Sequence, residues 1–194
     1  SSREGPFSVE GWARDCWSVL HQLGPERICV VGASAGAAVG FELAAAYPDR
    51  VHSLIGLGAA VLPGLPDADP LLAALADGPF DCALKRSLVN DAVAPDTGDA
   101  LRDQILVEIS DNDAPVVAAI WRAALATDVR PAARRWRGSC LLATGEHDRG
   151  CPPQDARAVA AEIGCEFRQL PGVGHLPFME EPGGVAALIE QWLR

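Results

Sequence analysis

The chain has 194 residues, 49% of them hydrophobic, which suits one domain that buries a large core. Its 26 acidic residues outnumber the 16 Lys and Arg residues, and the formal net charge of −10 argues against nucleic acid or an anionic membrane as a partner. A small-molecule substrate is the partner that this composition favours.

The first sixty residues predict helix, strand, helix and strand in alternation, which indicates an α/β fold built on a parallel sheet. Ser8 is the candidate N-cap of the first helix, Gly24-Pro25 ends that helix, and Pro48 stops the second. Both strands are apolar and rich in β-branched residues, as buried parallel strands are. The expected elements are a helix over 9–23, a strand over 28–31, a helix over 37–47 and a strand over 51–57.

Residues 61–137 differ from their flanks because prolines interrupt them and no strong strand pattern appears. Amphipathic helices are expected over 99–110 and 114–126, so this segment is interpreted as a helical cap or lid that excludes water from a substrate pocket. The α/β core is then expected in two parts, 1–60 and 138–194. The elements expected after the cap are a strand over 139–144, a helix over 153–163, a strand over 166–170 and a helix over 185–193.

The cysteines predict little about function. The six cysteines include no C-x-x-C pair, so neither a zinc site nor a redox site is expected. Cys29, Cys140 and Cys165 fall in predicted core strands, which favours free thiols, a reducing compartment and a cytoplasmic location.

A run of arginines is interpreted as a solvated surface, with a clamp for an anionic substrate as the alternative; it comprises Arg130, Arg134, Arg135 and Arg137.

The segment Gly32-Ala33-Ser34-Ala35-Gly36 fits the pattern G-x-S-x-G between a strand and a helix. Such a turn presents its serine as a nucleophile in strained backbone geometry, and the glycines provide room where strand and helix nearly touch. The N–H of Ala35, at the start of the helix, is positioned to stabilise an oxyanion. A membrane helix would need roughly 20 apolar residues, and a dinucleotide loop would need different glycine spacing, so both alternatives are less favoured.

A serine nucleophile needs a histidine base and an acid that orients it. His175 is the candidate base, because it stands in a glycine-rich loop just past a predicted strand, whereas the other histidines lack such a setting. Asp148 is the candidate acid, since it directly follows the strand at 139–144; Glu146 and Asp155 remain alternatives. The order Ser34, Asp148, His175 is the one expected of α/β-hydrolases.

The chain resembles the α/β-hydrolase superfamily, in its lidded esterase, lactonase and carbon–carbon hydrolase branch. The resemblance rests on Val-Val-Gly-Ala-Ser-Ala-Gly, Tyr-Pro-Asp-Arg-Val, Thr-Gly-Glu-His-Asp-Arg-Gly-Cys-Pro-Pro and Leu-Pro-Gly-Val-Gly-His-Leu-Pro-Phe-Met-Glu-Glu-Pro. It implies Ser34 as nucleophile, His175 as general base and Asp148 as its partner, with no metal and no organic cofactor.

The N-terminus departs from the family pattern. The family places its first strands, and an HG-type loop that gives a second oxyanion N–H, before the helix expected at 9–23. No such His-Gly pair occurs here, and residues 1–6 are similar to the end of the loop that precedes that helix. The resemblance therefore implies that the opening third of the fold is lacking, so that the chain is a fragment, has a reshaped start, or is completed by self-association or a second chain.

The expected activity is hydrolysis of a carboxylic ester, lactone or related acyl bond through an acyl-serine. Trp121 and the aliphatic positions of the cap favour a small apolar substrate. Two alternatives stay open: hydrolysis of a carbon–carbon bond with the same triad, and a non-catalytic protein that binds a ligand or signals.

Overall fold

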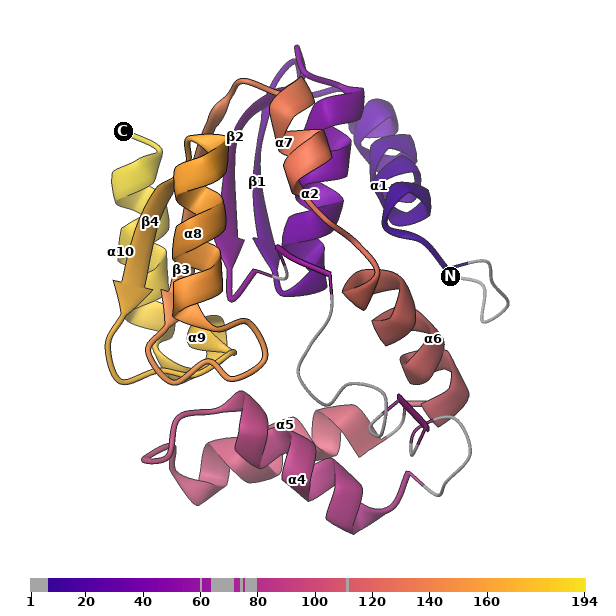
Figure 1. The fold of residues 1–194 in the computed structure, drawn as a ribbon, viewed down its shortest axis with the longest axis vertical. Helices are drawn as coiled ribbons and strands as arrows, with labels where there is room; N and C mark the ends of the chain where they lie inside the picture. The colour runs from indigo at the N-terminus through magenta and orange to yellow at the C-terminus, as the bar shows by residue number, and fades with distance from the viewer. Residues whose placement is uncertain (1–6, 60, 64–71, 74, 76–79, 111) are drawn as a thin grey trace.

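The structure is a computed structural model that describes residues 7–59, 61–63, 72–73, 75, 80–110 and 112–194. Four parallel strands form one sheet, and their spatial order is also their order in the chain (Figure 1). All four predicted strands are present, which confirms the α/β class. The strands are β1 (Ile28–Ala33), β2 (Val51–Leu57), β3 (Ser139–Gly145) and β4 (Glu166–Leu170).

The strands end at one common edge of the sheet. Ala33 at the end of β1 pairs with Leu57 of β2, and Leu57 pairs with Ala143 of β3. Gly145 of β3 pairs with Leu170, the last residue of β4. The loops that follow the four strands therefore meet at this edge, where parallel α/β folds place their reactive groups.

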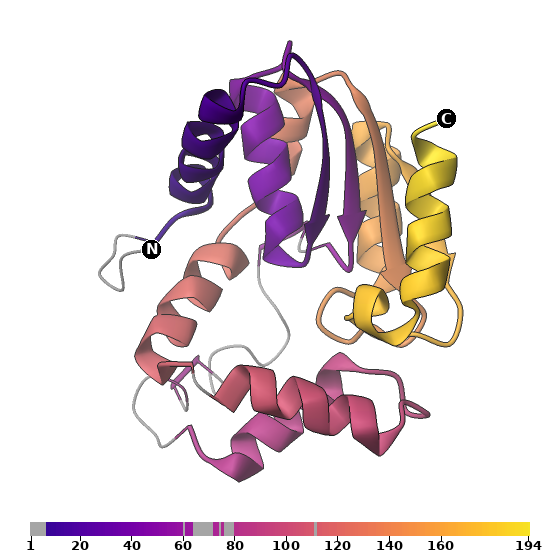
Figure 2. The same ribbon diagram turned by 180° about the vertical axis from the view of Figure 1, so that it is seen from behind.

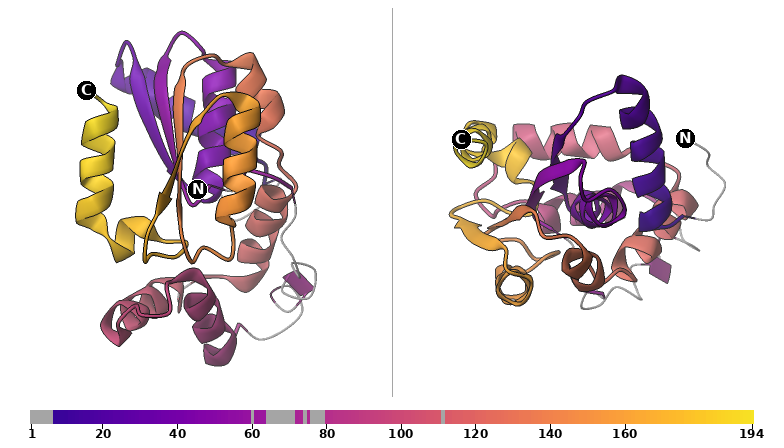
Figure 3. Two further views of the ribbon diagram at one scale, coloured as in Figure 1. Left: turned by 60° about the vertical axis from the view of Figure 1, so that its left-hand side comes forward. Right: turned by 90° about the horizontal axis from the view of Figure 1, so that it is seen from above.

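Each face of the sheet packs against helices, as Figures 1 and 3 show. Strand residues that alternate along the sheet point to opposite faces, so Leu54 and Leu142 belong to one hydrophobic cluster and Ile55 and Leu141 to the other. The first face packs against α2 (Ala35–Ala46), α7 (Arg130–Arg135) and α8 (Pro153–Ile163), with α1 (Val9–Leu23) outside α2. The second packs against α10 (Pro182–Trp192).

The predicted ends of the first helix are confirmed. The Gly11 N–H donates to Ser8 Oγ at 3.0 Å, which satisfies one of the unpaired donors of the first turn of α1. Gly24 follows the helix with φ 74°, a left-handed conformation that glycine adopts without strain. Helix α2 begins two residues earlier than predicted, because the turn after β1 is a single residue, Ser34.

Among the described residues, three helices lie beyond the carboxyl ends of the strands (Figures 1 and 2). They are α4 (Cys82–Ala92), α5 (Asp99–Ser110) and α6 (Ala114–Leu125). The bounds of α5 agree with the prediction and α6 ends one residue earlier, whereas α4 was not predicted. Residue 60, next to the predicted cap boundary, and Pro66, Pro70 and Pro79 lie outside the described residues, and the domain boundaries stay a prediction.

Cysteine pairing differs from the prediction. Cys140 in β3 and Cys165 just before β4 form a disulfide, so the expectation that both are free thiols was wrong. Their Cα atoms are 4.9 Å apart because β3 and β4 are neighbouring strands, and this separation lies within the range that a disulfide needs. Cys29 is a free thiol, as expected, and its sulfur accepts a hydrogen bond from Ser53 Oγ at 3.1 Å.

The arginine cluster is engaged with acidic neighbours. Arg130 and Arg134 pair with Glu162 of α8, and Arg135 pairs with Glu42 of α2 at 3.0 Å. These ion pairs connect α7 to α8 and to α2. The arrangement fits the interpretation as a solvated surface and leaves three of these arginines matched within the protein.

Strand β1 lies at the edge of the sheet. Among the described strands it pairs only with β2, and its Val31 side chain is 45% exposed. Whether self-association or a second chain covers this edge stays a prediction. In the part of the chain that the structure describes, no helix has the length and apolar character to cross a bilayer.

Candidate active site

Ser34 is held in an unusual backbone conformation between β1 and α2. Its φ is 50° and its ψ is −122°, and it is the only residue other than glycine with a positive φ in the described part of the chain. Its N–H donates to the Leu57 carbonyl at 2.9 Å, which ties the turn to the end of β2. A strained serine on a strand-to-helix turn is what the G-x-S-x-G pattern predicts.

Only one of the two glycines of the motif, Gly32, stands where a side chain would meet other atoms. A Cβ at Gly32 would overlap the carbonyl group of Gly36 and lie 2.7 Å from the Ala37 nitrogen, so the predicted close approach of strand and helix is present there. A Cβ at Gly36 would meet nothing within 4 Å. The expectation that Gly36 itself needs this space was wrong, since it is the backbone of Gly36 that crowds Gly32.

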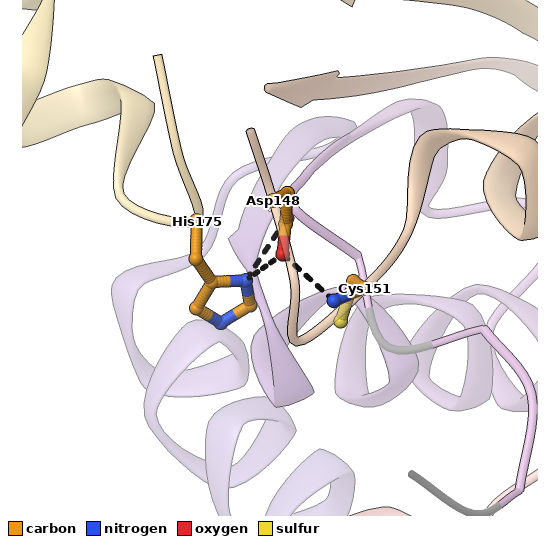
Figure 4. Close-up of side chains that lie close together, drawn as sticks. All are labelled: Asp148, Cys151 and His175. Carbon is orange, nitrogen blue, oxygen red and sulfur yellow. Dashed lines mark hydrogen bonds and ion pairs between the residues drawn. The ribbon is translucent and has the colours of Figure 1, made fainter. Parts of the chain in front are cut away.

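Three side chains from distant segments converge beside this turn. His175 Nε2 lies 3.0 Å from Ser34 Oγ, and His175 Nδ1 lies 3.0 Å from each carboxylate oxygen of Asp148. Ser34 follows β1, Asp148 follows β3 and His175 follows β4, so the common edge of the sheet brings them together. Figure 4 shows the His175 ring with one nitrogen directed at the Asp148 carboxylate. The structure thus places the predicted nucleophile, base and acid in one hydrogen-bonded chain.

Burial and charge favour a polarised Asp148–His175 pair. The Asp148 side chain has no exposed surface, and the Cys151 N–H donates to its Oδ1 at 2.7 Å. The His175 side chain is 17% exposed. Burial, the largest influence, lowers the pKa of His175, whereas the Asp148 carboxylate and the nearby Cys151 sulfur raise it, and the net effect is a pKa above the ordinary 6.5.

The alternative acids and histidines lie elsewhere. Glu146 is exposed and accepts a hydrogen bond from the Gly172 N–H at 3.0 Å, while Asp155 lies exposed in the first turn of α8. His21, His52 and His147 are exposed on α1, on β2 and on the loop after β3 respectively. Of the candidate acids, the geometry brings only Asp148 to His175.

Gly58 and Glu180 support the site and were not predicted. A Cβ at Gly58, whose φ is 52°, would lie 2.8 Å from the His175 carbonyl oxygen and 3.1 Å from Asp148 Oδ2. The Glu180 carboxylate, on the short helix α9 (Pro177–Glu180), accepts bonds from the N–H groups of Gly174 and Leu176, which flank His175. The only sequence signals were a glycine directly after a predicted strand and an acid five residues after the histidine.

Glu180 also links the histidine loop to the helices beyond the sheet. Its Oε2 accepts hydrogen bonds from the Ala94 N–H at 2.7 Å and from the Thr97 hydroxyl at 3.0 Å. The His175 N–H donates to the Ala92 carbonyl at the end of α4, at 2.7 Å. The loop that carries the base is therefore fixed from two sides by hydrogen bonds to the α4–α5 connection.

The apolar substrate pocket expected at Trp121 stays a prediction. One hollow among the described residues is a groove of about 530 Å³ between α4 and α5, lined by Arg86, Asp99, Arg102 and Asp103 among others. Its lining is charged and includes none of Ser34, Asp148 and His175. Arg102 is already occupied there, donating to Asn90 and to backbone carbonyls, so we assign the groove no part in the site.

Solved structures of an esterase, an enol-lactonase and a bromoperoxidase match almost the whole chain. An esterase from Thermogutta terrifontis is 26% identical with a TM-score of 0.85, and the match covers 98% of this chain and 73% of that one. An enol-lactonase from Burkholderia xenovorans LB400 is 22% identical with a TM-score of 0.87, covering 98% and 74%. A bromoperoxidase from Bacillus anthracis is 16% identical with a TM-score of 0.86, covering 100% and 77%.

A comparison with curated proteins found no match. The family model described as the alpha/beta hydrolase family matches residues 1–188, nearly the full length of the chain. The parallel sheet, the strained turn at Ser34 and the structural matches agree with this result. The chain belongs to the alpha/beta hydrolase family.

Proposed function

We propose that this chain is a serine hydrolase that cleaves the ester, lactone or related acyl bond of a small apolar substrate. The observation that carries the proposal is the contact chain from Ser34 Oγ to His175 Nε2 and from His175 Nδ1 to Asp148, with 3.0 Å at each step. Nucleophile, base and orienting acid within hydrogen-bond reach are the requirements for acyl transfer through a serine. The resemblance to an esterase and to an enol-lactonase supports this substrate class.

In the first half of the reaction, His175 Nε2 accepts the proton of Ser34 as Oγ attacks the carbonyl carbon. The negative charge that develops on the carbonyl oxygen is stabilised by the Ala35 N–H and by the N-terminal end of α2. Asp148 keeps the Nδ1 proton directed at itself, so that Nε2 is free to act as the base. The intermediate collapses when His175 returns its proton to the leaving alcohol, which leaves the acyl group on Ser34.

In the second half, water takes the place of the alcohol. His175 accepts a proton from the water as the water attacks the acyl-serine, and then returns it to Ser34 Oγ as the acid product leaves. Both halves require a neutral imidazole at the start. Because the pKa of His175 is raised, the hydrolysis rate should increase with pH above neutrality as this proton is lost.

A fluorophosphonate probe tests the nucleophile directly, since it reacts with a serine that a neighbouring base activates. We expect labelling of the protein at Ser34 and turnover of p-nitrophenyl acetate. Ser34→Ala should abolish labelling and lower the rate by about 10⁶-fold, because the bond-forming atom is gone. The matched control is Ser87→Ala, at an exposed serine of α4, which should keep both signals.

Two results would contradict the proposal. One is undiminished turnover in a folded Ser34→Ala variant, which would mean that another group attacks the substrate. The other is folded wild-type protein that neither reacts with the probe nor turns over p-nitrophenyl esters, which would favour a binding protein. Circular dichroism of each variant establishes that the fold is retained.

A further inference from the structure

Cys151 has no part in the proposed reaction, yet its thiol lies beside the acid and the base. One ligand atom from each of Asp148, Cys151 and His175 can be chosen so that all three atoms lie within 4.8 Å of one another. The first two residues belong to the loop after β3, and His175 belongs to the loop after β4 (Figure 4). The thiol, carboxylate and imidazole are thus gathered in one place by the sheet edge that forms the candidate active site.

These three groups are the ligand types that zinc binds in proteins. Zinc takes cysteine sulfur at about 2.3 Å, histidine nitrogen at about 2.0–2.1 Å and carboxylate oxygen at about 2.0–2.2 Å. We infer that Asp148, Cys151 and His175 form a zinc-binding site, and that zinc bound there inhibits hydrolysis. A thiolate and a carboxylate together balance the charge of a divalent cation, and three protein ligands leave a fourth position for water.

The geometry needs only a small adjustment to hold the ion. Ligands of a tetrahedral zinc lie roughly 3.3–3.6 Å apart, as follows from those bond lengths. The Asp148–His175 contact is 3.0 Å and must open slightly, whereas the thiol must close in by at most about 1 Å, a movement of the size that rotation of the Cys151 side chain supplies. Asp148 is enclosed, but Cys151 and His175 are partly exposed, so the ion and its water have access from their side.

Zinc at this position would stop His175 from acting as a base, although the ring would stay in place. The ion occupies the lone pair of His175 Nδ1, so the single proton of the neutral ring moves from Nδ1 to Nε2, and the thiol proton leaves to solvent. The ring then donates a hydrogen bond to Ser34 Oγ and can no longer accept its proton. Asp148, now a zinc ligand, no longer orients the ring. The inhibition rests on the proposed function, whereas binding of the ion does not.

The experiment uses Co²⁺ and Zn²⁺ as probes of the full chain. To remove other exposed thiols, the reference protein carries Cys16→Ser and Cys82→Ser, which lie on α1 and α4. Co²⁺ should give a thiolate-to-cobalt absorption band in the near ultraviolet, and Zn²⁺ should displace it with one equivalent. Adding Cys151→Ser should abolish the band and weaken zinc binding by at least about 100-fold, because even outer-shell changes typically cost 10–100-fold.

Enzyme assays then test the consequence. Zn²⁺ should inhibit turnover of p-nitrophenyl acetate by the reference protein, EDTA should restore the rate, and Cys151→Ser should raise the inhibition constant by the same factor as the dissociation constant. A missing cobalt band, or a band and a zinc affinity unchanged in Cys151→Ser, would overturn the site. Failure of the hydrolase proposal would be recognised separately, as absent fluorophosphonate labelling in metal-free protein.

Discussion

Asp148 and Asp128 each hold a basic partner with both carboxylate oxygens, and the two pairs differ in the partner and in burial. Asp148 contacts His175 Nδ1 at 3.0 Å through each oxygen, and its side chain has no exposed surface. Asp128 accepts bonds from Arg130 at 2.7–3.1 Å, and the two side chains are 29% and 33% exposed. The distances are alike, but the partners differ as well as the surroundings, since an imidazole can exchange a proton near neutral pH and a guanidinium cannot.

Burial changes the role of such a pair because it weakens dielectric screening. Around Asp148, little water competes for the carboxylate, and its charge acts fully on the His175 ring. Around Asp128, solvent and salt screen the attraction to Arg130, and measured surface pairs of this kind contribute 1 kcal/mol or less. We therefore expect the buried pair to determine catalysis and the surface pair to add only slightly to stability.

The largest effect is expected from Asp148→Asn. The Cys151 N–H holds the amide oxygen at the Oδ1 position, so the amide NH2 takes the Oδ2 position and donates to Nδ1. His175 then adopts the wrong tautomer, and the turnover rate should fall by about 10⁴-fold. The near-identical shape should leave the fold in place. The matched control is Asp155→Asn, at an exposed acid of α8, which should retain activity. Equal losses in the two variants, measured with p-nitrophenyl acetate, would remove the distinction drawn between Asp148 and the surface acids.

A smaller but still large effect is expected from Gly58→Ala, which crowds Asp148 and His175 but leaves both residues chemically unchanged. The added methyl would lie 3.1 Å from Asp148 Oδ2 and 3.2 Å from His175 Nδ1, so one of them must shift, and a misplacement of this kind lowers the rate by about 10²-fold. The control is Gly164→Ala, since Gly164 has φ 78° but nothing within 4 Å of the added methyl. Both variants carry backbone strain; if both lose the same activity, strain rather than crowding is the cause.

Glu180→Gln should weaken the support of the histidine loop by an intermediate amount. The amide group turns one acceptor oxygen into a donor that faces two existing donors, either Gly174 and Leu176 or Ala94 and Thr97. We expect the turnover rate to fall about 10–100-fold with little change in KM, because the base is misplaced and the substrate is not. Glu181→Gln, at the exposed neighbouring residue, is the control and should leave both parameters unchanged.

Much of the sheet and of the site followed from local sequence. The strands at 51–57 and 166–170 and the helices at 9–23 and 153–163 have the predicted bounds, because apolar periodicity and end signals such as Ser8 and Gly24 are local features. Ser34, Asp148 and His175 were identifiable because each follows a strand, and parallel strands end at one edge.

The remainder depends on tertiary contacts that no local pattern encodes. The Cys140–Cys165 disulfide requires that β3 and β4 be neighbours, a pairing that the composition of either strand does not specify. Gly58 is restricted by Asp148 and His175, which are 90 or more residues away in the chain. Helix α4 was missed although Leu84 and Leu88 stand at helical spacing, and Val89 is its only buried residue.

The smallest effect is expected from Asp128→Asn, which tests how much the partly exposed Asp128–Arg130 pair contributes to stability. Hydrogen bonds from Arg130 are the main cause of the lowered pKa of Asp128, so the pair stabilises the fold above the ordinary pKa of 3.8 and loses this contribution as pH falls through the lowered value. At pH 7 the variant should reduce the free energy of unfolding by less than about 1 kcal/mol, and 1 M salt should shrink the difference. Urea denaturation measures it, with the exposed Asp49→Asn as the control. A loss of several kcal/mol that persists in salt would mean that exposure does not separate the two aspartates.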